Sequence, residues 1–389
     1  MIVFGTVLAL MCIFINPLYI LIIGSFIEMY KKLPSYLNYV LAFSIAIAIA
    51  NREIGVQWSS VDGFGKDDAI NYLSFYFQTQ YSSYIVNFIE IIPNIFKGKE
   101  PLWFILAEIS GRVSSYNGSF LIFISIFVPI LLLHFSFQKI TKYFCFSALV
   151  FYFLVPEVFH MLFHLFRTSI GLSIVILCFA GLLAANKSRS KLIYLAPFGH
   201  LAMILPASVL FFGRYISFDL SILNKIISII ILSILFFIGI YVLLYIASII
   251  GFEKIVFHLT FEAEMFKLHT RHLVYLILAI YLIFVTKNKN IFIVSLTAFL
   301  LILLPFSFNS IGIIYERILI IFTPLLALSL VYESSASKFK RFCIISILTI
   351  NFLYLITKIS DKLFWQYMAD GQFFNFFSGL FYHFYTFLM

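Results

Sequence analysis

Four ionisable side chains lie close together in an apolar stretch, at the spacing of one helix face. Glu157, His160, His164 and Arg167 follow one another at intervals of three, four and three residues. On a helix, residues three or four apart share a face. Charged groups at membrane depth usually face a bundle interior or a watery cavity, because exposure to lipid is costly. The stretch from Pro156 to Gly171 therefore predicts the edge of a polar cavity.

Two arginines in this chain could bind an anionic ligand. Arg167 follows the histidines, and Arg317 lies beside Glu316 at the start of a late apolar run. A guanidinium binds phosphate oxygens in pairs and stays charged in a low-dielectric site, so the two together suit a phosphate or diphosphate. Each arginine alone could instead extend to the membrane interface as an anchor.

Histidines and carboxylates supply further candidates, each with a structural alternative. His160 and His164 could form a metal pair four residues apart, but a third ligand would have to come from elsewhere, and cavity lining is the favoured interpretation. Asp67 and Asp68 could simply cap the helix that follows them. Glu100 precedes Pro101, which is the pattern of a helix start.

The composition indicates what must position these groups. Of 389 residues, 63% are hydrophobic and 11% are charged, against about 25% charged in soluble domains. Repeated apolar runs of about 17 to 25 residues predict an all-α, polytopic integral membrane bundle of roughly 10–12 transmembrane helices, with re-entrant or half-length helices. No signal peptide is expected, since the first run lacks a basic flank and a cleavage site. The four cysteines lie inside apolar runs and are expected to be buried.

The net charge of +9 comes mostly from Lys and Arg in short loops, which mark the cytoplasmic side. Because Lys31 and Lys32 mark the cytoplasmic side, the first helix, over about 2–28, is expected to place the N-terminus outside. Further crossings are expected over about 34–50, 118–137, 143–163, 227–250, 272–286, 291–307, 313–332 and 341–357, with another inward crossing that starts at Arg167. No concentrated basic face suggests nucleic-acid binding.

The residues form one predicted membrane domain, 1–389, with four special segments. The stretch 191–214 is expected to enter and leave the membrane as a hairpin with His200 near its tip, because Pro197 and Gly199 interrupt it and this keeps later basic loops cytoplasmic. Three segments are expected outside: a loop with interfacial and half-inserted helices over 51–115, a loop over 252–271, and an aromatic interfacial tail over 361–389.

On this topology the ionisable candidates collect at the outer side, with a turn between His164 and Arg167 that makes Arg167 the first residue of a new helix. Nucleotides are scarce there. No phosphate-binding glycine loop, dinucleotide fingerprint or nucleophile elbow appears in the sequence. These features argue against nucleotide-driven chemistry.

Four short motifs, in order, carry a resemblance to a known family. They are Asp67-Asp68-Ala-Ile-Asn-Tyr72, Glu-Pro-Leu-Trp at 100–103, Arg-Thr-Ser-Ile-Gly-Leu-Ser at 167–173 and Gly-His-Leu-Ala-Met-Ile-Leu-Pro at 199–206. The chain resembles the EpsG-like group of Wzy-type polysaccharide polymerases over about 50–215, and Glu316-Arg317 extends the likeness. It departs from the family pattern at Trp103, where Phe is usual, and at Gly199, where an aromatic is common.

The resemblance implies a GT-C-like membrane glycosyltransferase that transfers a growing glycan from undecaprenyl diphosphate to another lipid-linked repeat unit. Arg167 and Arg317 would bind the donor diphosphate. His200, or a carboxylate among Asp67, Asp68 and Glu100, would remove the acceptor proton. The remaining expected substrate-binding or orienting residues are Glu316, Tyr72, Glu157 and His164.

The same resemblance implies no metal and no cofactor, because two arginines neutralise the diphosphate. Its expected partners are the undecaprenyl-diphosphate-linked oligosaccharide, membrane lipid and a chain-length regulator protein. The expected location is the bacterial cytoplasmic membrane, with the site facing the periplasm or cell exterior. The alternatives are a lipid-linked oligosaccharide flippase or transporter, which would need two related halves, an O-antigen ligase-like transferase with the same donor chemistry, and a glycan O-acyltransferase.

Overall fold

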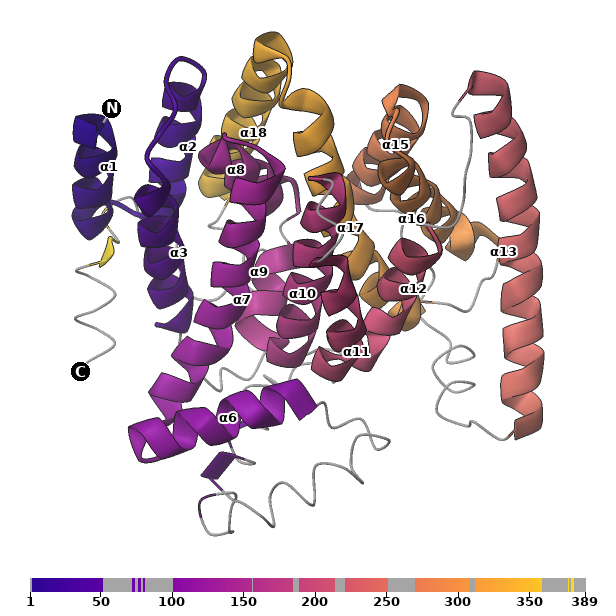
Figure 1. Cartoon of the computed structure of the whole chain (residues 1–389), viewed down its shortest axis with the longest axis horizontal. Coiled ribbons are helices and arrows are strands. Elements are labelled where there is room, and N and C mark those ends of the chain that lie inside the picture. Colours follow the sequence, from indigo (N-terminus) through magenta and orange to yellow (C-terminus); the bar gives the residue numbers. More distant parts are fainter. Residues whose placement is uncertain are drawn as a thin grey trace. The chain divides into compact units, whose positions relative to one another are not determined.

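The protein is all-α wherever its structure is described. The computed structural model describes residues 2–51, 72–73, 76–77, 80, 101–155, 157–184, 189–213, 221–250, 270–307, 312–358, 377 and 379–380. Every regular element in these ranges is a helix (Figure 1). This confirms the predicted all-α class.

The chain divides into two compact units. The first contains Met1–Ile204 and Ser334–Met389, and the second contains Leu205–Glu333. Most of the predicted external segments 51–115, 252–271 and 361–389 lies outside the described residues. The predicted single domain and its external segments stay predictions.

The first unit is a bundle of helices with several short pieces. Its helices are α1 (Ile2–Phe14), α2 (Pro17–Glu28), α3 (Ser35–Ala50), α6 (Pro101–Ser114), α7 (Gly118–Ile140), α8 (Phe144–Leu154), α9 (Glu157–His164), α10 (Phe166–Leu183), α11 (Ala196–Gly199) and α18 (Lys338–Lys358). The helix α7 packs against both α3 and α10, which makes these three the centre of the bundle.

The predicted continuous helix over 2–28 is wrong, because α1 ends at Phe14 and α2 begins at Pro17. Proline has no N–H to continue the helical ladder, and its ring favours a first helical position. The buried Asn16 accepts a hydrogen bond from Leu18 N at 2.9 Å and so caps the new helix. The sequence signal for the break is this Asn-Pro pair.

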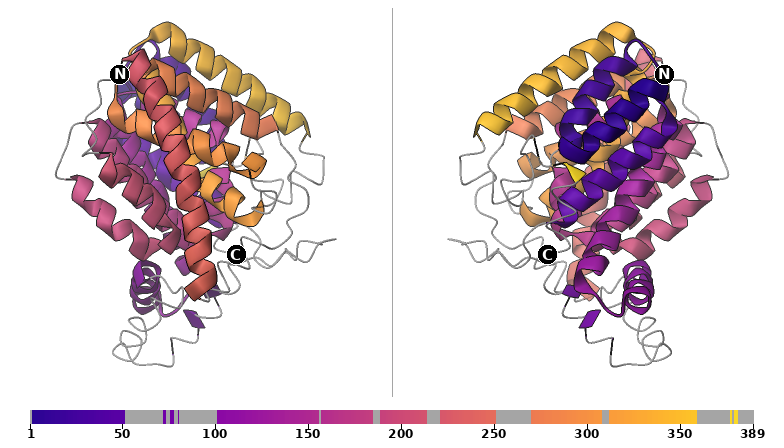
Figure 2. Two further views of the ribbon diagram at one scale, coloured as in Figure 1. Left: turned by 90° about the vertical axis from the view of Figure 1, so that its right-hand side faces the viewer. Right: turned by 90° about the vertical axis from the view of Figure 1, so that its left-hand side faces the viewer.

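The break also reverses the chain, so the predicted placement of the N-terminus opposite Lys31 is wrong. Thr6 Oγ1 lies 2.9 Å from Tyr36 Oη at the start of α3, and Lys31 Nζ lies 5.0 Å above the Phe4 ring. Figure 2 shows α1 beside the helices that follow it. The N-terminus therefore lies at the same end of the unit as Lys31.

The predicted crossing over 143–163 is also divided. The helix α8 ends at Leu154, its cap Val155 has φ −123° and ψ 74°, and α9 starts at Glu157. The residue before a proline disfavours the helical region, which accounts for the break before Pro156. A second break at Leu165 separates α9 from α10. Arg167 is thus the second residue of a new helix, in agreement with the predicted turn.

Three basic clusters meet at one end of the first unit, which we call the basic end. It contains Lys31, Lys32, Lys139, Lys142, Lys338, Lys340 and Arg341. Lys338 Nζ lies 4.1 Å from the ring centroid of Tyr30, and the Arg341 guanidinium carbon lies 3.9 Å from that of Tyr143. The Gln138 side chain donates to Ser35 O at 3.0 Å, which joins the end of α7 to the start of α3.

A fully buried polar triad links α3, α7 and α8. The Asn38 amide donates to His134 O at 2.7 Å, so its oxygen faces His134 Nδ1 at 2.8 Å. Since an amide oxygen only accepts, Nδ1 carries the proton, and Nε2 accepts from Tyr152 Oη at 3.1 Å. All three side chains are buried and each ring nitrogen is satisfied. Such a network fixes the relative positions of three helices.

Replacement of His134 by leucine is expected to lower the unfolding free energy by about 1–3 kcal/mol, because the buried Asn38 oxygen and the Tyr152 hydroxyl lose their partner. Thermal unfolding of the purified chain in detergent measures this. Ser125→Ala is the matched control, since the buried Ser125 hydroxyl on the same helix has no hydrogen-bond partner among the described residues. A His134→Leu variant as stable as Ser125→Ala would contradict a stabilising role for the triad.

The second unit contains α12 (Ile204–Phe212), α13 (Ile222–Ile250), α15 (Thr270–Val285), α16 (Lys289–Ser307) and most of α17 (Gly312–Ser334). Its described core joins α15 and α16 through Ile283, Phe292 and Leu296. The buried Lys225 ammonium donates to Phe284 O at 3.0 Å and to Thr286 O at 2.7 Å. It thereby satisfies carbonyls that the end of α15 leaves unpaired.

Two described helices, α7 and α10, are long and apolar enough to cross a bilayer. At 1.5 Å per residue their 23 and 18 residues rise about 34 and 27 Å, close to the roughly 30 Å of a hydrocarbon core. Several shorter apolar helices of 10–17 residues accompany them. The coarse prediction of long apolar helices is confirmed.

Candidate functional site

Arg167 lies at the start of α10 and is held by an aromatic side chain from a distant part of the chain. Its Nε donates to Tyr72 Oη at 3.0 Å, and its guanidinium carbon lies 5.3 Å from the Tyr72 ring centroid. A single tyrosine thus contacts the cation through both its hydroxyl and its ring. Arg167 is half-buried, so the guanidinium is oriented without being sealed from a ligand.

Two further rings fix Tyr72. Its centroid lies 4.9 Å from that of Trp103 and 5.4 Å from that of Phe166. Trp103 is 1% exposed and belongs to α6, whereas Phe166 is the first residue of α10. Such ring pairs stabilise a defined geometry. Three segments therefore combine to position one arginine.

The helix α6 lies across the end of α7 instead of alongside it (Figure 1). One edge is buried through Trp103, while Ile105, Ile109 and Val113 are exposed at intervals of four residues. An apolar edge at helical spacing is typical of a helix that lies along a membrane interface. The sequence predicted a short, half-inserted helix here; the length of 14 residues confirms that the helix is short, and its insertion stays a prediction.

Two glycines bring the His200 segment against α10, one turn beyond Arg167. A Cβ on Gly199 would lie 2.7 Å from Gly171 Cα, and one on Gly171 would lie 3.1 Å from His200 N. No real side chain fits at 2.7 Å from backbone, so the contact requires glycine at Gly199. Gly171 follows Arg167 by four residues and shares its face of the helix. Arg167 and His200 therefore belong to neighbouring segments.

His200 interrupts the helical path of its segment. A 3₁₀ helix over Arg189–Leu195 leads into α11, His200 has φ −158° and ψ 131°, and a 3₁₀ turn over Leu201–Met203 follows. Its Nδ1 accepts from Ala202 N at 3.2 Å, so in the neutral ring the proton is on Nε2. The stretch 191–214 is thus no continuous helix, as predicted. Its return limb α12 belongs to the second unit, so the hairpin itself stays a prediction.

The remaining predicted site residues are placed only in part. Asp67, Asp68 and Glu100 lie outside the described residues. Glu157 and His164 are the first and last residues of α9, with only their backbone described. Glu316 and Arg317 belong to α17 in the second unit, again as backbone. The structure brings together Tyr72, Arg167 and the His200 segment, and it leaves the Arg167–Arg317 pair untested.

The Tyr72 segment lies at the opposite end of α7 from the basic end. A Cβ on Gly118, the first residue of α7, would lie 3.1 Å from the Leu73 side chain and 3.2 Å from that of Phe77. The last turns of α7 contact α3 at Ser35. Since α7 rises about 34 Å between these points, the Arg167 site and the lysine clusters lie at opposite ends of the first unit.

The junction between α6 and α7 lies at the same end of the first unit as the Tyr72 segment. Ser115 and Tyr116 both have positive φ, 52° and 62°, which is uncommon for side chains other than glycine. Tyr76 Oη contacts Ser114 Oγ at 3.3 Å, and its ring lies 5.3 Å from that of Tyr116. Burial, and then the nearby Glu108 carboxylate, raise the pKa of Tyr116 above its usual value. The phenol therefore stays neutral at physiological pH.

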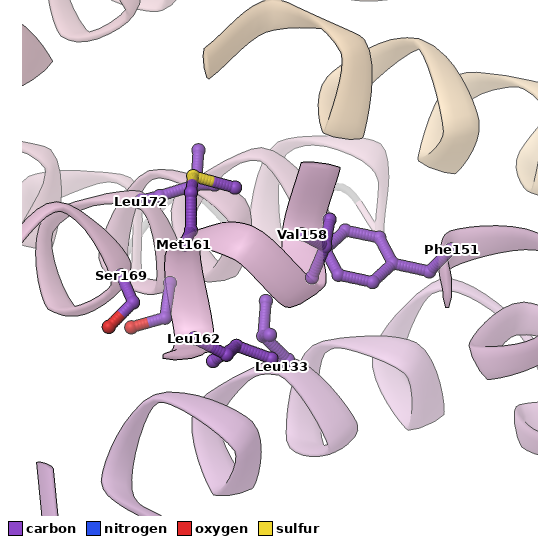
Figure 3. A pocket seen from close by; sticks show the side chains of 8 residues that line it. Leu133, Phe151, Val158, Met161, Leu162, Ser169 and Leu172 are labelled. Atoms are coloured by element: carbon purple, nitrogen blue, oxygen red, sulfur yellow. The ribbon is translucent and has the colours of Figure 1, made fainter. Parts of the chain in front are cut away.

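A small cavity next to α10 is too small to be a substrate site. It has a volume of about 10 Å³, and Figure 3 shows it between Leu172, Met161, Leu162 and Val158. The hydroxyl of Ser169 that borders it already donates to Phe166 O. That volume holds about one water molecule.

Sequence reasoning missed the roles of Trp103, Gly171 and Gly199. Trp103 was visible only as a departure from a family pattern, Gly199 was also visible as an interruption of the stretch 191–214, and no local signal paired Gly199 with Gly171. No three His, Cys, Asp or Glu side chains of the described chain gather as metal ligands. No family model, curated protein or solved structure matches this chain.

Proposed function

We propose that this chain is a polysaccharide polymerase of the cytoplasmic membrane of a bacterium. It would transfer a growing glycan from undecaprenyl diphosphate to another undecaprenyl-diphosphate-linked repeat unit at the outer face. The observation that carries the proposal is the half-buried Arg167, oriented by Tyr72 beside the His200 segment, at the end of the first unit that faces away from the lysine clusters.

A polytopic membrane location is supported by apolar surfaces that water would not favour. On α13 the exposed side chains include Ile226, Ile230, Ile234 and Ile238, and on α15 they include Ile277 and Phe284. Exposed apolar patches of this extent mark membrane or protein contact. Together with the sequence-wide apolar runs they support a multi-pass bundle of roughly 10–12 crossings, and the GT-C-like arrangement is proposed from the family resemblance alone.

The orientation follows from the charge distribution. Lysine and arginine clusters accumulate on the cytoplasmic side of membrane proteins. The basic end of the first unit would then face the cytoplasm, and Arg167 would face outward. This orientation suits a reaction that uses lipid-linked donors and no nucleotide.

In this reaction the protein mainly positions reactants and stabilises developing negative charge on the leaving diphosphate. Arg167 would bind diphosphate oxygens through its terminal nitrogens, because its Nε is already engaged by Tyr72. The base that accepts the proton of the acceptor hydroxyl would be Asp67, Asp68 or Glu100, or His200 after its deprotonated Nδ1 has released Ala202 N. Arg317 would supply the second cation, and Glu316, Glu157 and His164 would orient or line the site.

A deletion strain tests the proposal. Loss of the chain is expected to collapse the ladder of glycan lengths on a gel to a single repeat unit, because transfer between lipid-linked units stops. Plasmid-borne full-length chain should restore the ladder. Long polymer retained on the polyprenyl carrier would indicate a ligase instead, and loss of all surface glycan with single units trapped inside would indicate a flippase.

A further inference from the structure

The helical turn that carries Tyr72 is attached to α6 at two points. Tyr72 and Tyr76 both belong to this turn, four residues apart, and both are buried. The Tyr72 ring contacts Trp103 near the start of α6, and the Tyr76 hydroxyl lies 3.3 Å from Ser114 Oγ at the end of α6. Trp103 and Ser114 lie about three turns, or about 16 Å, apart along the helix. The turn is therefore held from both ends of α6.

A single hydroxyl makes the second attachment. Ser114 Oγ donates to Ser110 O at 2.8 Å, so its own proton is used and it accepts from Tyr76. Tyr76 Oη also donates to Asn117 O at 3.4 Å, so its one proton is shared between two acceptors. Both acceptors belong to the corner between α6 and α7.

The corner that presents these acceptors is fixed by its own contacts. Ser115 and Tyr116 have φ of 52° and 62°, and residues other than glycine keep such angles only where the surroundings impose them. The Tyr116 amide donates to Gly111 O at 2.9 Å, which closes the end of α6. The Asn117 side chain caps α7. The corner is therefore a fixed base for the Tyr76 hydroxyl.

The same turn also packs against the first residue of α7. A Cβ on Gly118 would lie 3.1 Å from the Leu73 side chain and 3.2 Å from that of Phe77. Apolar packing of this kind has no preferred direction. A hydrogen bond, in contrast, fixes both a distance and an angle. The Tyr76 hydroxyl therefore adds an orientation of the turn that apolar packing alone does not define.

We propose that Tyr76 is a positioning residue for Arg167. Its hydroxyl holds the turn against the α6–α7 corner at the place where Tyr72 Oη accepts from Arg167 Nε. Tyr76 acts through Tyr72 and contributes no group to the reaction itself. The effect of Tyr76 on glycan transfer rests on the proposed function, whereas its effect on the Arg167 guanidinium does not.

The test is the rate at which phenylglyoxal modifies Arg167 in the purified full chain in detergent, measured by mass spectrometry of its peptides. Phenylglyoxal attacks the neutral guanidine, and the Tyr72 contacts stabilise the charged form, so release from Tyr72 accelerates the modification. Relative to the exposed Arg271 of the same chain, Tyr72→Phe is expected to raise the rate at least about tenfold and Tyr76→Phe about two- to tenfold. Tyr76→Phe should add nothing in the Tyr72→Phe background, because both changes act on one hydrogen bond.

Tyr39→Phe is the matched control. Tyr39 Oη donates to Gln138 Oε1 at 3.2 Å, close to the 3.3 Å between Tyr76 Oη and Ser114 Oγ, but this contact lies near the basic end. The control should leave the modification rate of Arg167 unchanged. In cells, Tyr76→Phe is expected to reduce long-chain glycan, whereas Tyr39→Phe should keep the full ladder.

Two results would overturn the proposal. A modification rate of Arg167 in Tyr76→Phe equal to that of wild type would remove the link between the two residues. A full further increase in the Tyr72→Phe background would show that Tyr76 does not act through Tyr72. A ladder that does not respond to Arg167→Ala would instead overturn the proposed function alone. Thermal unfolding identifies a variant that fails to fold, and Ser114→Ala, which removes one acceptor of the same hydroxyl, then replaces Tyr76→Phe, with about a twofold increase expected.

Discussion

Cells in which Arg167 is replaced by alanine are expected to lose long-chain glycan while the protein still reaches the membrane. The guanidinium would stabilise the negative charge that develops on the leaving diphosphate, and removal of one such donor costs on the order of a hundredfold or more in rate. The measurement is the distribution of glycan lengths on a gel, with the amount of protein in the membrane fraction determined in parallel.

Arg112→Ala provides the matched control. Arg112 is also an arginine of the first unit, but its half-exposed guanidinium pairs with the buried Glu108 carboxylate of the same helix, to which Nε donates at 2.9 Å. Because this cation is already neutralised within α6, its loss should lower stability but leave the ladder. An unchanged ladder in Arg167→Ala, or an equal loss in both variants, would remove Arg167 from the proposed site.

The contact with Tyr72 predicts an intermediate effect for Tyr72→Phe. This change keeps the ring between Trp103 and Phe166 but deletes the hydroxyl that accepts from Arg167 Nε. A hydrogen bond to a charged group is worth about 1.5–3 kcal/mol. If the whole of this energy is lost in the transition state, the rate of glycan transfer falls at least about tenfold. Thermal unfolding of wild type, Tyr72→Phe and Arg167→Ala separates the two roles of Tyr72, because a positioning role reduces long-chain glycan more than it reduces stability.

The sequence was sufficient to predict helices wherever apolar periodicity and end signals agree. The late helices α15, α16, α17 and α18 begin and end within a few residues of their predicted bounds. The Arg167 helix also starts within one residue of its predicted start. In each case the signal is local, because a Lys, Gly, Asn or Ser next to an apolar run marks the end of the helix.

The errors arise where one or two residues divide an apolar run without changing its hydropathy. Asn16-Pro17 and Pro156 sit in runs that look continuous, yet each ends a helix. At Asn16 the consequence is large, since the reversal moves the N-terminus to the other end of the unit. The Tyr72–Arg167 contact was equally invisible, because it joins residues 95 apart and depends on the packing of Trp103 and Phe166.

The glycine contact between α10 and the His200 segment predicts a graded series of alanine variants. Gly199→Ala is expected to lower the unfolding free energy by about 1–3 kcal/mol, because its Cβ would lie 2.7 Å from both Cα and N of Gly171, which are backbone atoms. Gly171→Ala should cost less, since its Cβ first meets the Met203 side chain. Gly239→Ala has no atom within 4 Å and should be neutral or stabilising by about 0.5–1 kcal/mol.

A double-mutant cycle with Met203→Ala distinguishes this contact from general destabilisation. Shortening the buried Met203 should relieve part of the cost of Gly171→Ala, because Met203 Cγ is the nearest atom to the new methyl group at 2.7 Å. Met203→Ala should not reduce the cost of Gly199→Ala, because the new methyl group there clashes with the backbone of α10. The measurements are thermal unfolding and the glycan ladder for each variant. If Gly199→Ala keeps both wild-type stability and a full ladder, then the two segments do not need this close approach, and the placement of the His200 segment against α10 loses its physical basis.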